Sequence, residues 1–176
     1  MTKAPGTSGS AWAVTSGERS PQTVARLLGL LPDWFGIPSS NAHYVDMAGR
    51  LPTYLARPAT DAAAAPAPGA EPAGVLLAER HFPGAAEIYL LAVDPATHRR
   101  GAGRALVEAL ERDLIADGVR LLQVKTLGPS HPDAGYRLTR LFYEAMGFAP
   151  LEELTGLWPE NPCLVMVKVL QSRQAR

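Results

Sequence analysis

The sequence has one cysteine, no excess charge of either sign and no hydrophobic run long enough to cross a membrane. Cys163 has no partner within the chain, which excludes an internal disulfide. The 17 Lys and Arg residues balance the 17 Asp and Glu residues, so no overall field would draw the chain to nucleic acid or to an anionic membrane. A spanning helix needs about 20 apolar residues, whereas candidates such as 88–93 have the length of a strand.

The first ten residues also lack the apolar stretch of a signal peptide. Together with the lone cysteine, this predicts a cytoplasmic protein. No nucleic-acid partner, membrane partner or metal site is predicted, and any anion site is expected to be local.

Length and low-complexity segments predict one domain. A chain of 176 residues is long enough to bury a core. Residues 1–10 are small and polar, so we expect a mobile arm there and a single domain over 11–176. Residues 62–73 are nearly all Ala, Pro and Gly, which cannot bury a patterned face. Because this segment lies between two expected strands, we interpret it as a long hairpin loop.

Hydrophobic spacing and turn residues predict a mixed α/β (α+β) fold. Ser20 followed by Pro21 is typical of a helix start, and Gly118 and Gly147 are typical of left-handed helix ends. The expected elements are, in chain order, helix 21–31, a helix that begins after Ser39 or Ser40 and runs toward Arg50, strands 53–57, 75–79 and 87–93, a helix through Leu106, Leu110 and Leu114, strand 121–126, helix 136–146, and strands 151–154 and 164–169.

The order of these elements predicts their pairing. The Pro83-Gly84 turn makes strands 75–79 and 87–93 antiparallel neighbours. Strand 121–126 follows a helix that itself follows a strand, so it is expected to lie parallel to 87–93 in a right-handed crossover. Simple alternation along 87–93 would place Glu87, Tyr89, Leu91 and Val93 on one face.

The loop 94–104 breaks the rules for an ordinary helix start. Gly101 and Gly103 each cost about 1 kcal/mol of helix propensity relative to Ala. Arg99, Arg100 and Arg104 place positive charge at the positive end of the helix dipole. A bound phosphate would resolve both problems, because glycines admit it to the backbone amides and the arginines balance its charge. The alternative is a solvated arginine cluster on a flexible helix start.

Three segments resemble the GNAT family of acetyl-CoA-dependent acyltransferases in content, order and spacing. They are Leu91 to Pro95, His98 to Leu106, and Phe142 to Phe148. The resemblance covers about residues 74–170 and implies a mixed sheet of about seven strands, a splayed parallel pair and about four helices on both faces. The family motif begins with Gln or Arg where this sequence has His98, which leaves the backbone cradle intact.

The resemblance implies an acetyl-CoA site and roles for individual residues. Main-chain groups of strand 87–93 would hold the pantetheine arm, and one of their amides would polarise the thioester carbonyl. The loop from His98 to Gly103 would hold the pyrophosphate. The residues that this implies for the coenzyme are Leu91, Ala92, Val93, His98, Arg99, Arg100, Gly101, Ala102, Gly103 and Arg104.

Tyr143 is the expected proton donor to the leaving thiolate. On a helical wheel it shares a face with Tyr136 and Thr139, beside an expected core stripe. A phenol titrates near 10, close to a thiol. The alternative is a packing tyrosine at the edge of the sheet. The members of the expected core stripe are Leu138, Leu141, Phe142, Ala145 and Met146.

The sequence also offers candidates for the general base and for the residues that bind the acceptor. Some family members carry a Glu where this sequence has Gln123, and some carry an Asn where it has Tyr136. Glu87 is the expected base, with His131 and Asp133 as a second candidate pair. Trp34 and Phe35 lie between the two N-terminal helices, which flank the acceptor cleft in this family. They are therefore expected to bind substrate together with His131, with Trp158 a weaker candidate; packing is the alternative for each aromatic.

These expectations predict an N-acetyltransferase that transfers the acetyl group of acetyl-CoA directly, in a ternary complex, to a primary amine of a small molecule or amino-acid derivative. One alternative is an acetyltransferase of protein N-termini or lysines. A second is a CoA-binding sensor or interaction domain without turnover. The resemblance also allows a homodimer, because proteins of this family are commonly dimers.

Overall fold

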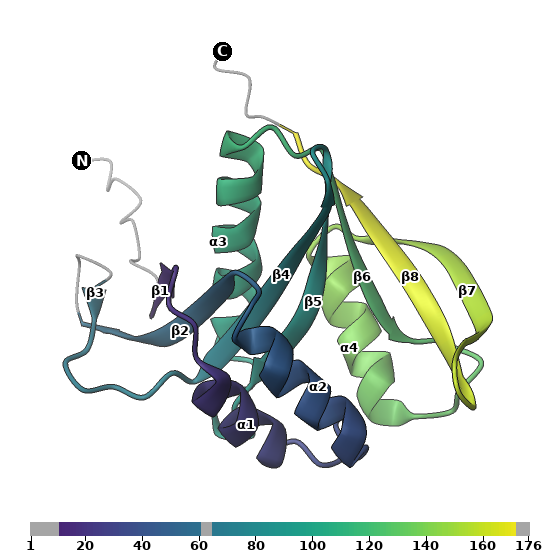
Figure 1. Cartoon of the computed structure of the whole chain (residues 1–176), viewed down its shortest axis with the longest axis horizontal. Helices are drawn as coiled ribbons and strands as arrows, with labels where there is room; N and C mark the ends of the chain where they lie inside the picture. The colour runs from purple at the N-terminus through teal and green to yellow at the C-terminus, as the bar shows by residue number, and fades with distance from the viewer. Residues whose placement is uncertain (1–10, 61–64, 172–176) are drawn as a thin grey trace, which may run out of the picture.

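The computed structural model describes residues 11–60 and 65–171, which form a mixed sheet with helices on both faces (Figure 1). The strand order is β1-β2-β4-β5-β6-β8-β7, and β3 pairs with β2 beside this path. The arm expected for residues 1–10, and residues 62–64 of the expected loop, lie outside the described residues. The elements are β1 Trp12–Ser16, α1 Pro21–Gly29, α2 Pro38–Ala48, β2 Thr53–Thr60, β3 Ala65–Pro66, β4 Gly74–Phe82, β5 Ala85–Val93, a 3-10 helix Pro95–Thr97, α3 Ala102–Ala116, β6 Leu121–Leu127, α4 Ala134–Ala145, β7 Ala149–Trp158 and β8 Asn161–Val169.

The central parallel pair opens along its length, as expected. β5 and β6 pair only from Ala85 with Leu121 to Ile88 with Val124. Beyond that point β5 stays with β4, whereas β6 stays with β8. The sheet therefore divides into two halves, and no strand among the described residues pairs with the edge of β5 that faces β6 from Tyr89 to Val93 (Figure 1).

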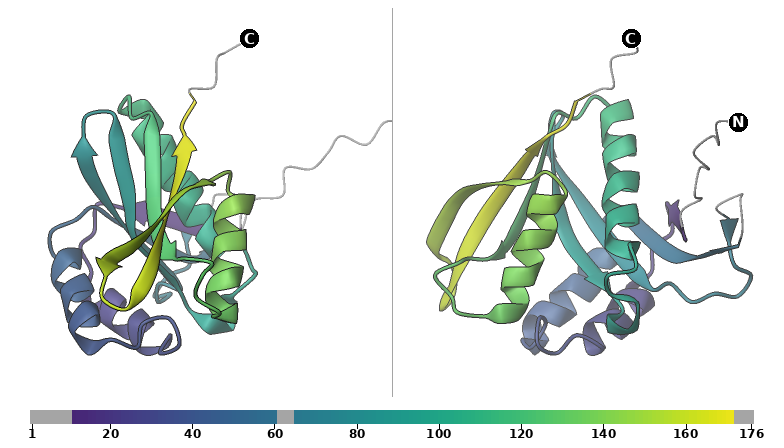
Figure 2. Two further views of the ribbon diagram at one scale, coloured as in Figure 1. Left: turned by 90° about the vertical axis from the view of Figure 1, so that its right-hand side faces the viewer. Right: turned by 180° about the vertical axis from the view of Figure 1, so that it is seen from behind.

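Each face of the sheet has its own core. On one face, α3 and α4 pack through residues such as Leu106, Leu110 and Met146. On the other face, α1 packs through Val24, Leu27 and Leu28 together with α2 (Figure 2). The two layers hold the diverging ends of β5 and β6 between them.

Several helix boundaries follow the predicted signals. Ser20 is the N-cap of α1 with Pro21 at its first position, and Gly118 and Gly147 have φ angles of +76° and +87°. α2 begins earlier than expected, at Pro38, because proline also fits the first turn of a helix. β1 was not predicted, since five residues between a polar segment and a turn give little periodic signal.

A β-bulge at Tyr89 corrects the predicted alternation in β5. Leu77 pairs with Leu90 and the next residue, Ala78, pairs with Ile88, so Tyr89 is the extra residue. Past the bulge the faces exchange. Ile88 and Leu91 therefore both belong to the α3–α4 face, whereas Leu90 belongs to the α1–α2 face. The prediction that Glu87, Tyr89, Leu91 and Val93 share one face is wrong.

The apolar stripe of α4 is also corrected. Leu138 and Leu141 are 52% and 47% exposed, and Ala145 is exposed as well. Tyr143 is buried, with only 5% of its surface exposed. Of the expected stripe, only Met146 is fully buried. The reason is that Leu138, Leu141 and Phe142 face a cleft in place of the core.

The tyrosines predict alkaline instability. Burial raises the pKa of all five tyrosines above the usual 10, namely Tyr44, Tyr54, Tyr89, Tyr136 and Tyr143. Above pH 10 the unfolded chain loses phenolic protons that the folded chain retains, so stability is present below pH 10 and falls as pH rises. Tyr143 alone would remove up to about 1.4 kcal/mol per pH unit. Urea unfolding between pH 8 and pH 11.5, with tyrosinate absorbance as a second signal, checks this.

Tyrosinate absorbance should rise together with unfolding. A half-rise near pH 10 in the folded protein would contradict the expectation, because it would mean that the phenols titrate freely.

Candidate active site

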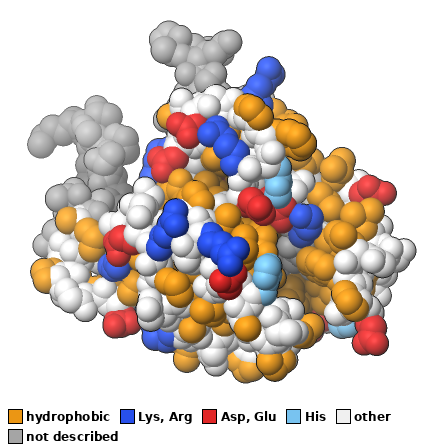
Figure 3. Space-filling view, in the orientation of Figure 1, with side chains coloured by type: hydrophobic (Ala, Val, Ile, Leu, Met, Phe, Trp, Pro, Cys, Tyr) orange, Lys and Arg blue, Asp and Glu red, His pale blue; other side chains and the backbone are white. Residues whose placement is uncertain are grey.

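A cleft of about 690 Å³ lies where the two halves of the sheet diverge. Its walls come from the end of β5, the loop before α3, the start of α3, the middle of β6 and the inner side of α4. The loop between α1 and α2 lines its other end. In the space-filling view, apolar side chains gather around the hollow on this face (Figure 3).

The loop before α3 has the geometry of an anion cradle. Arg99 and Gly101 have φ angles of 60° and 91°, both in the left-handed region. The first helical hydrogen bond runs from the amide of Ala105 to the carbonyl oxygen of Gly101, at 2.9 Å. The three amides between these residues have no acceptor within the helix, and they lie at the positive end of its dipole. Phosphate oxygens are suited to this position.

Gly103 lies close to the facing helix. A Cβ added to Gly103 would lie 3.3 Å from Cζ of Phe142 on α4. The start of α3 and α4 therefore lie on opposite sides of a narrow part of the cleft. Two of the arginines expected to bind the coenzyme, Arg99 and Arg104, line the cleft.

Arg100 is the exception among the expected coenzyme residues. All the others line the cleft, but Arg100 is not among the lining residues. Its carbonyl oxygen instead accepts a hydrogen bond from the indole Nε1 of Trp12, at 2.6 Å. Trp12 is buried in β1, so a strand that sequence reasoning missed holds the cradle in place.

His98 acts as a link between the loop and β5. Its Nε2 lies 2.9 Å from the carbonyl oxygen of Val93, and because a carbonyl only accepts, the imidazole donates. The ring also meets the edge of Trp34, with centroids 6.1 Å apart. The side chain thus occupies one main-chain acceptor of the open strand edge.

Tyr143 is a buried residue of α4 that reaches the cleft. It lines the cleft and packs against Phe142 and Phe148, with ring centroids 5.3 and 5.6 Å apart. Burial raises the pKa of its phenol well above 10, so it stays protonated near neutral pH. No residue in the described part of the chain forms a hydrogen bond with its hydroxyl. The group is therefore free to meet a ligand.

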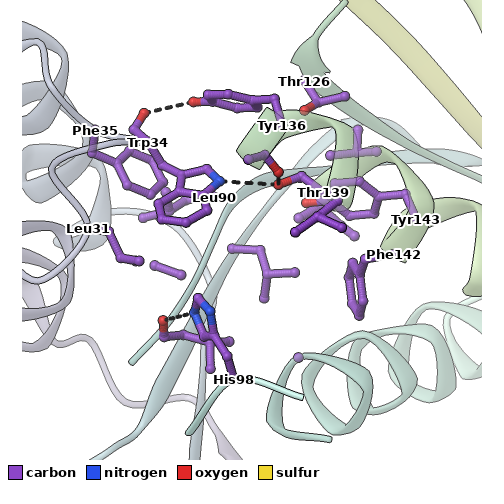
Figure 4. A pocket seen from close by; sticks show the side chains of 18 of the residues that line it. Leu31, Trp34, Phe35, Leu90, His98, Thr126, Tyr136, Thr139, Phe142 and Tyr143 are labelled. Carbon is purple, nitrogen blue, oxygen red and sulfur yellow. Dashed lines mark hydrogen bonds between the residues drawn. The ribbon is translucent and has the colours of Figure 1, made fainter. Parts of the chain in front are cut away.

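Trp34 joins the two walls at the aromatic end. Its indole Nε1 donates to Oγ1 of Thr139 at 3.3 Å, and its carbonyl oxygen accepts from the hydroxyl of Tyr136 at 2.7 Å. Figure 4 shows the indole nitrogen pointing toward Thr139 on α4. Gly135 leaves room for this ring, because a Cβ there would lie 3.2 Å from it. The α1–α2 loop is thereby fixed to α4.

Phe35 and Trp158 also line the cleft, and two further tyrosines extend the aromatic wall. The Phe35 and Tyr44 rings meet at 5.9 Å between centroids, and Tyr44 meets Tyr89 at the same distance. Sequence reasoning did not select Tyr44, because a single tyrosine on a helix of weak amphipathicity gives no distinguishing signal.

Glu87 lies outside the residues that line the cleft. It is 5% exposed, and its Oε2 accepts hydrogen bonds from Lys125 at 2.6 Å, Gln123 at 2.7 Å and His81 at 2.8 Å. Burial alone would raise its pKa, but the hydrogen bonds from Lys125, His81 and Gln123 hold the pKa below 4.5. A carboxylate so engaged is a weak base. Its expected catalytic role stays a prediction.

The second candidate pair for the base is placed elsewhere too. Asp133 is the N-cap of α4 and accepts from the amide of Tyr136 at 2.8 Å. Nδ1 of His131 is buried and has no partner among the described residues. Neither side chain lines the cleft, so the geometry does not bring His131 to Trp34 and Phe35 as a common acceptor site.

Thr126 is a further cleft residue that sequence reasoning missed. It lies on β6, is 4% exposed, and its hydroxyl has no partner within the described ranges. A threonine inside a strand is common for reasons of propensity alone, so nothing in the sequence marked it.

Comparison with protein families agrees with this geometry. Residues 67–150 match the family model of the acetyltransferase (GNAT) domain. This part of the chain is therefore similar to a GNAT acetyltransferase domain. The GNAT resemblance seen in the sequence and the predicted GNAT fold are both confirmed, and the chain is an acyltransferase. A search of curated proteins found no match.

Solved structures share the GNAT fold over nearly the whole chain. A Desulfovibrio desulfuricans protein described as a GNAT-family acetyltransferase has a TM-score of 0.73 at 20% identity, covering 92% of this chain and 100% of that one. The Escherichia coli ribosomal-protein-S18-alanine N-acetyltransferase has a TM-score of 0.66 at 20% identity, covering 93% and 96%. An aminoglycoside 6'-N-acetyltransferase complexed with coenzyme A has a TM-score of 0.64 at 19% identity, covering 92% and 99%.

Across the described part of the chain, no helix is both long and apolar enough to span a membrane. The same residues contain no group of three or more His, Cys, Asp or Glu side chains that could hold a metal ion.

Proposed function

We propose that this GNAT domain transfers the acetyl group of acetyl-CoA directly to a primary amine of a small molecule or amino-acid derivative. The proposal depends on one observation: the amide cradle of α3, the aromatic side chains Trp34 and Phe35, and Tyr143 all line a single cleft. In this proposal the residues expected for the coenzyme, apart from Arg100, line one end, and Trp34 and Phe35 bind the acceptor at the other.

The residues at the coenzyme end fit the groups of acetyl-CoA. The left-handed Gly101 and the unpaired amides at the start of α3 suit a pyrophosphate, and Arg99 and Arg104 supply charge. The open edge of β5 offers main-chain groups to an extended arm. Acetyl-CoA would supply the activated acyl carbon as a thioester. A β5 amide would polarise its carbonyl, and Tyr143 would protonate the thiolate.

Proton transfer from Tyr143 is compatible with its raised pKa. Burial disfavours the charged form of any acid, so a thiol released beside the phenol would have a raised pKa as well. The two groups would therefore remain matched inside the same dry cleft.

The acceptor end supports a small acceptor with few positive charges. The charged side chains that line the cleft are Arg99, Arg104 and Lys125, and among the described residues no Asp or Glu lines it. A polycation would find no counter-charge there. The Trp34 link to α4 also closes this end to an extended polypeptide. Aromatic walls instead favour an amine attached to an apolar or aromatic group.

An amine panel tests the proposal. Thiol release from acetyl-CoA would be measured with aromatic monoamines, amino-acid amides, polyamines and peptides, alongside calorimetry with CoA. We expect turnover with one or more of the small monoamines or amino-acid derivatives, at a kcat/KM at least about 10-fold above that for peptides and polyamines. That ratio corresponds to about 1.4 kcal/mol. A preference for peptides would instead favour the protein acetyltransferase, and CoA binding without turnover would favour the sensor.

A further inference from the structure

The proposed reaction needs a group that removes a proton from the acceptor amine. An ammonium must lose a proton before its nitrogen can attack a thioester. No carboxylate lines the cleft within the described ranges, and the carboxylate of Glu87 is engaged by three donors outside it. A base must therefore come from another group that reaches the aromatic end.

Tyr89 is the phenol that the bulge in β5 turns into this end. It lines the cleft past the last residue pair between β5 and β6. Its hydroxyl lies 2.6 Å from Nε2 of His43, which is on α2 and exposed to solvent. The pair thus connects the cleft to bulk water through one hydrogen bond. Because Tyr89 is the bulged residue, its place in the cleft could not be read from strand alternation.

We propose that Tyr89 and His43 form the proton relay that deprotonates the acceptor amine, an inference that rests on the proposed acetyl transfer. In the tautomer that carries its proton on Nδ1, His43 accepts from the Tyr89 hydroxyl. The acceptor ammonium gives a proton to the phenol oxygen while the phenolic proton passes to Nε2. The products are a neutral amine, a neutral phenol and an imidazolium, which returns the proton to solvent.

The surroundings suit a phenol that relays a proton without ionising. Burial, with Tyr44, Glu79 and Glu87 nearby, raises the pKa of Tyr89, so tyrosinate is disfavoured. The other titratable residues near His43 on α2 are Tyr44, whose pKa burial raises, and Asp46, which pairs with Arg50 at 2.9 Å. Arg26, the titratable residue of α1, pairs with Glu71 at 3.3 Å.

The relay gives kcat/KM a distinctive pH profile. For the best amine of the panel, kcat/KM should fall as the pH is lowered, because an imidazolium cannot accept a proton. In His43→Gln, which cannot take a proton, and in Tyr89→Phe, we expect a loss of about 10²-fold at pH 7. In both variants kcat/KM should then keep rising with pH until the pH reaches the pKa of the amine itself. A residue with only a structural role would lower kcat/KM by one factor at every pH.

Two controls complete the experiment. Asp46→Asn changes the same helix three residues further on and should retain the wild-type profile. Glu87→Gln should also keep the fall in kcat/KM at acid pH. The relay is overturned if wild-type protein turns over the amine and both His43→Gln and Tyr89→Phe keep its profile, or if Glu87→Gln alone removes the acid limb. Absence of turnover in the wild type with every amine would instead refute the proposed function.

Discussion

Replacement of Tyr143 by phenylalanine is expected to lower kcat by about 10²-fold and to leave the KM for acetyl-CoA close to that of the wild type. Proton transfer by a positioned side chain contributes roughly 10² to 10⁴ in rate. The substitution removes only the hydroxyl, while the ring contacts with Phe142 and Phe148 remain. Steady-state kinetics across pH 6–9, with thermal unfolding to verify the fold, provide the measurement.

Tyr54 offers a matched control. It is also buried, at 7% exposure, but its hydroxyl donates to Asp113 at 2.8 Å and it does not line the cleft. Tyr54→Phe should therefore lower stability by about 1 kcal/mol through the lost hydrogen bond and leave kcat unchanged. Equal kcat values for Tyr143→Phe and wild type at every pH would remove Tyr143 from the mechanism.

Substitution of Gly101 by alanine is expected to weaken CoA binding by at least about 10-fold. The residue has a φ angle of 91°, where an L side chain costs roughly 1–2 kcal/mol. Relief of that strain would move the three amides that follow Gly101 away from the phosphate position. Steric overlap is not the cause, since a Cβ there would be 3.9 Å from Trp12. Calorimetry with CoA measures the effect.

Gly118 separates backbone strain from coenzyme binding. It lies beyond the other end of α3 with a φ angle of 76° and has open space around its Cα. Gly118→Ala should lose similar stability yet bind CoA like the wild type. If both variants bind CoA equally well, the cradle does not hold the coenzyme.

The sequence predicted what depends on local pattern. Strand–helix order and turn residues predicted the parallel β5–β6 pair, and the two glycines with their arginines indicated the cradle loop. Strand alternation failed at Tyr89, because a bulge depends on the register with β4, which one strand does not encode. The prediction that the apolar stripe of α4 packs in the core was wrong, because an apolar face that lines a cleft has the same spacing as one that lines a core.

The other features that the sequence did not predict depend on contacts between distant segments. The Trp12 support of the loop spans 88 positions in the chain, and the Trp34 contact with Thr139 spans 105. His43 and Tyr89 lie on different elements as well, so their hydrogen bond is a product of how α2 packs near β5. No spacing rule connects such positions.

The indole of Trp34 contacts both His98, in the loop proposed to hold the coenzyme, and Thr139, at the end of the cleft proposed for the acceptor. Any displacement of that ring by one substrate changes the room left for the other. Donor and acceptor affinities would then be coupled by one free energy that acts equally in both directions.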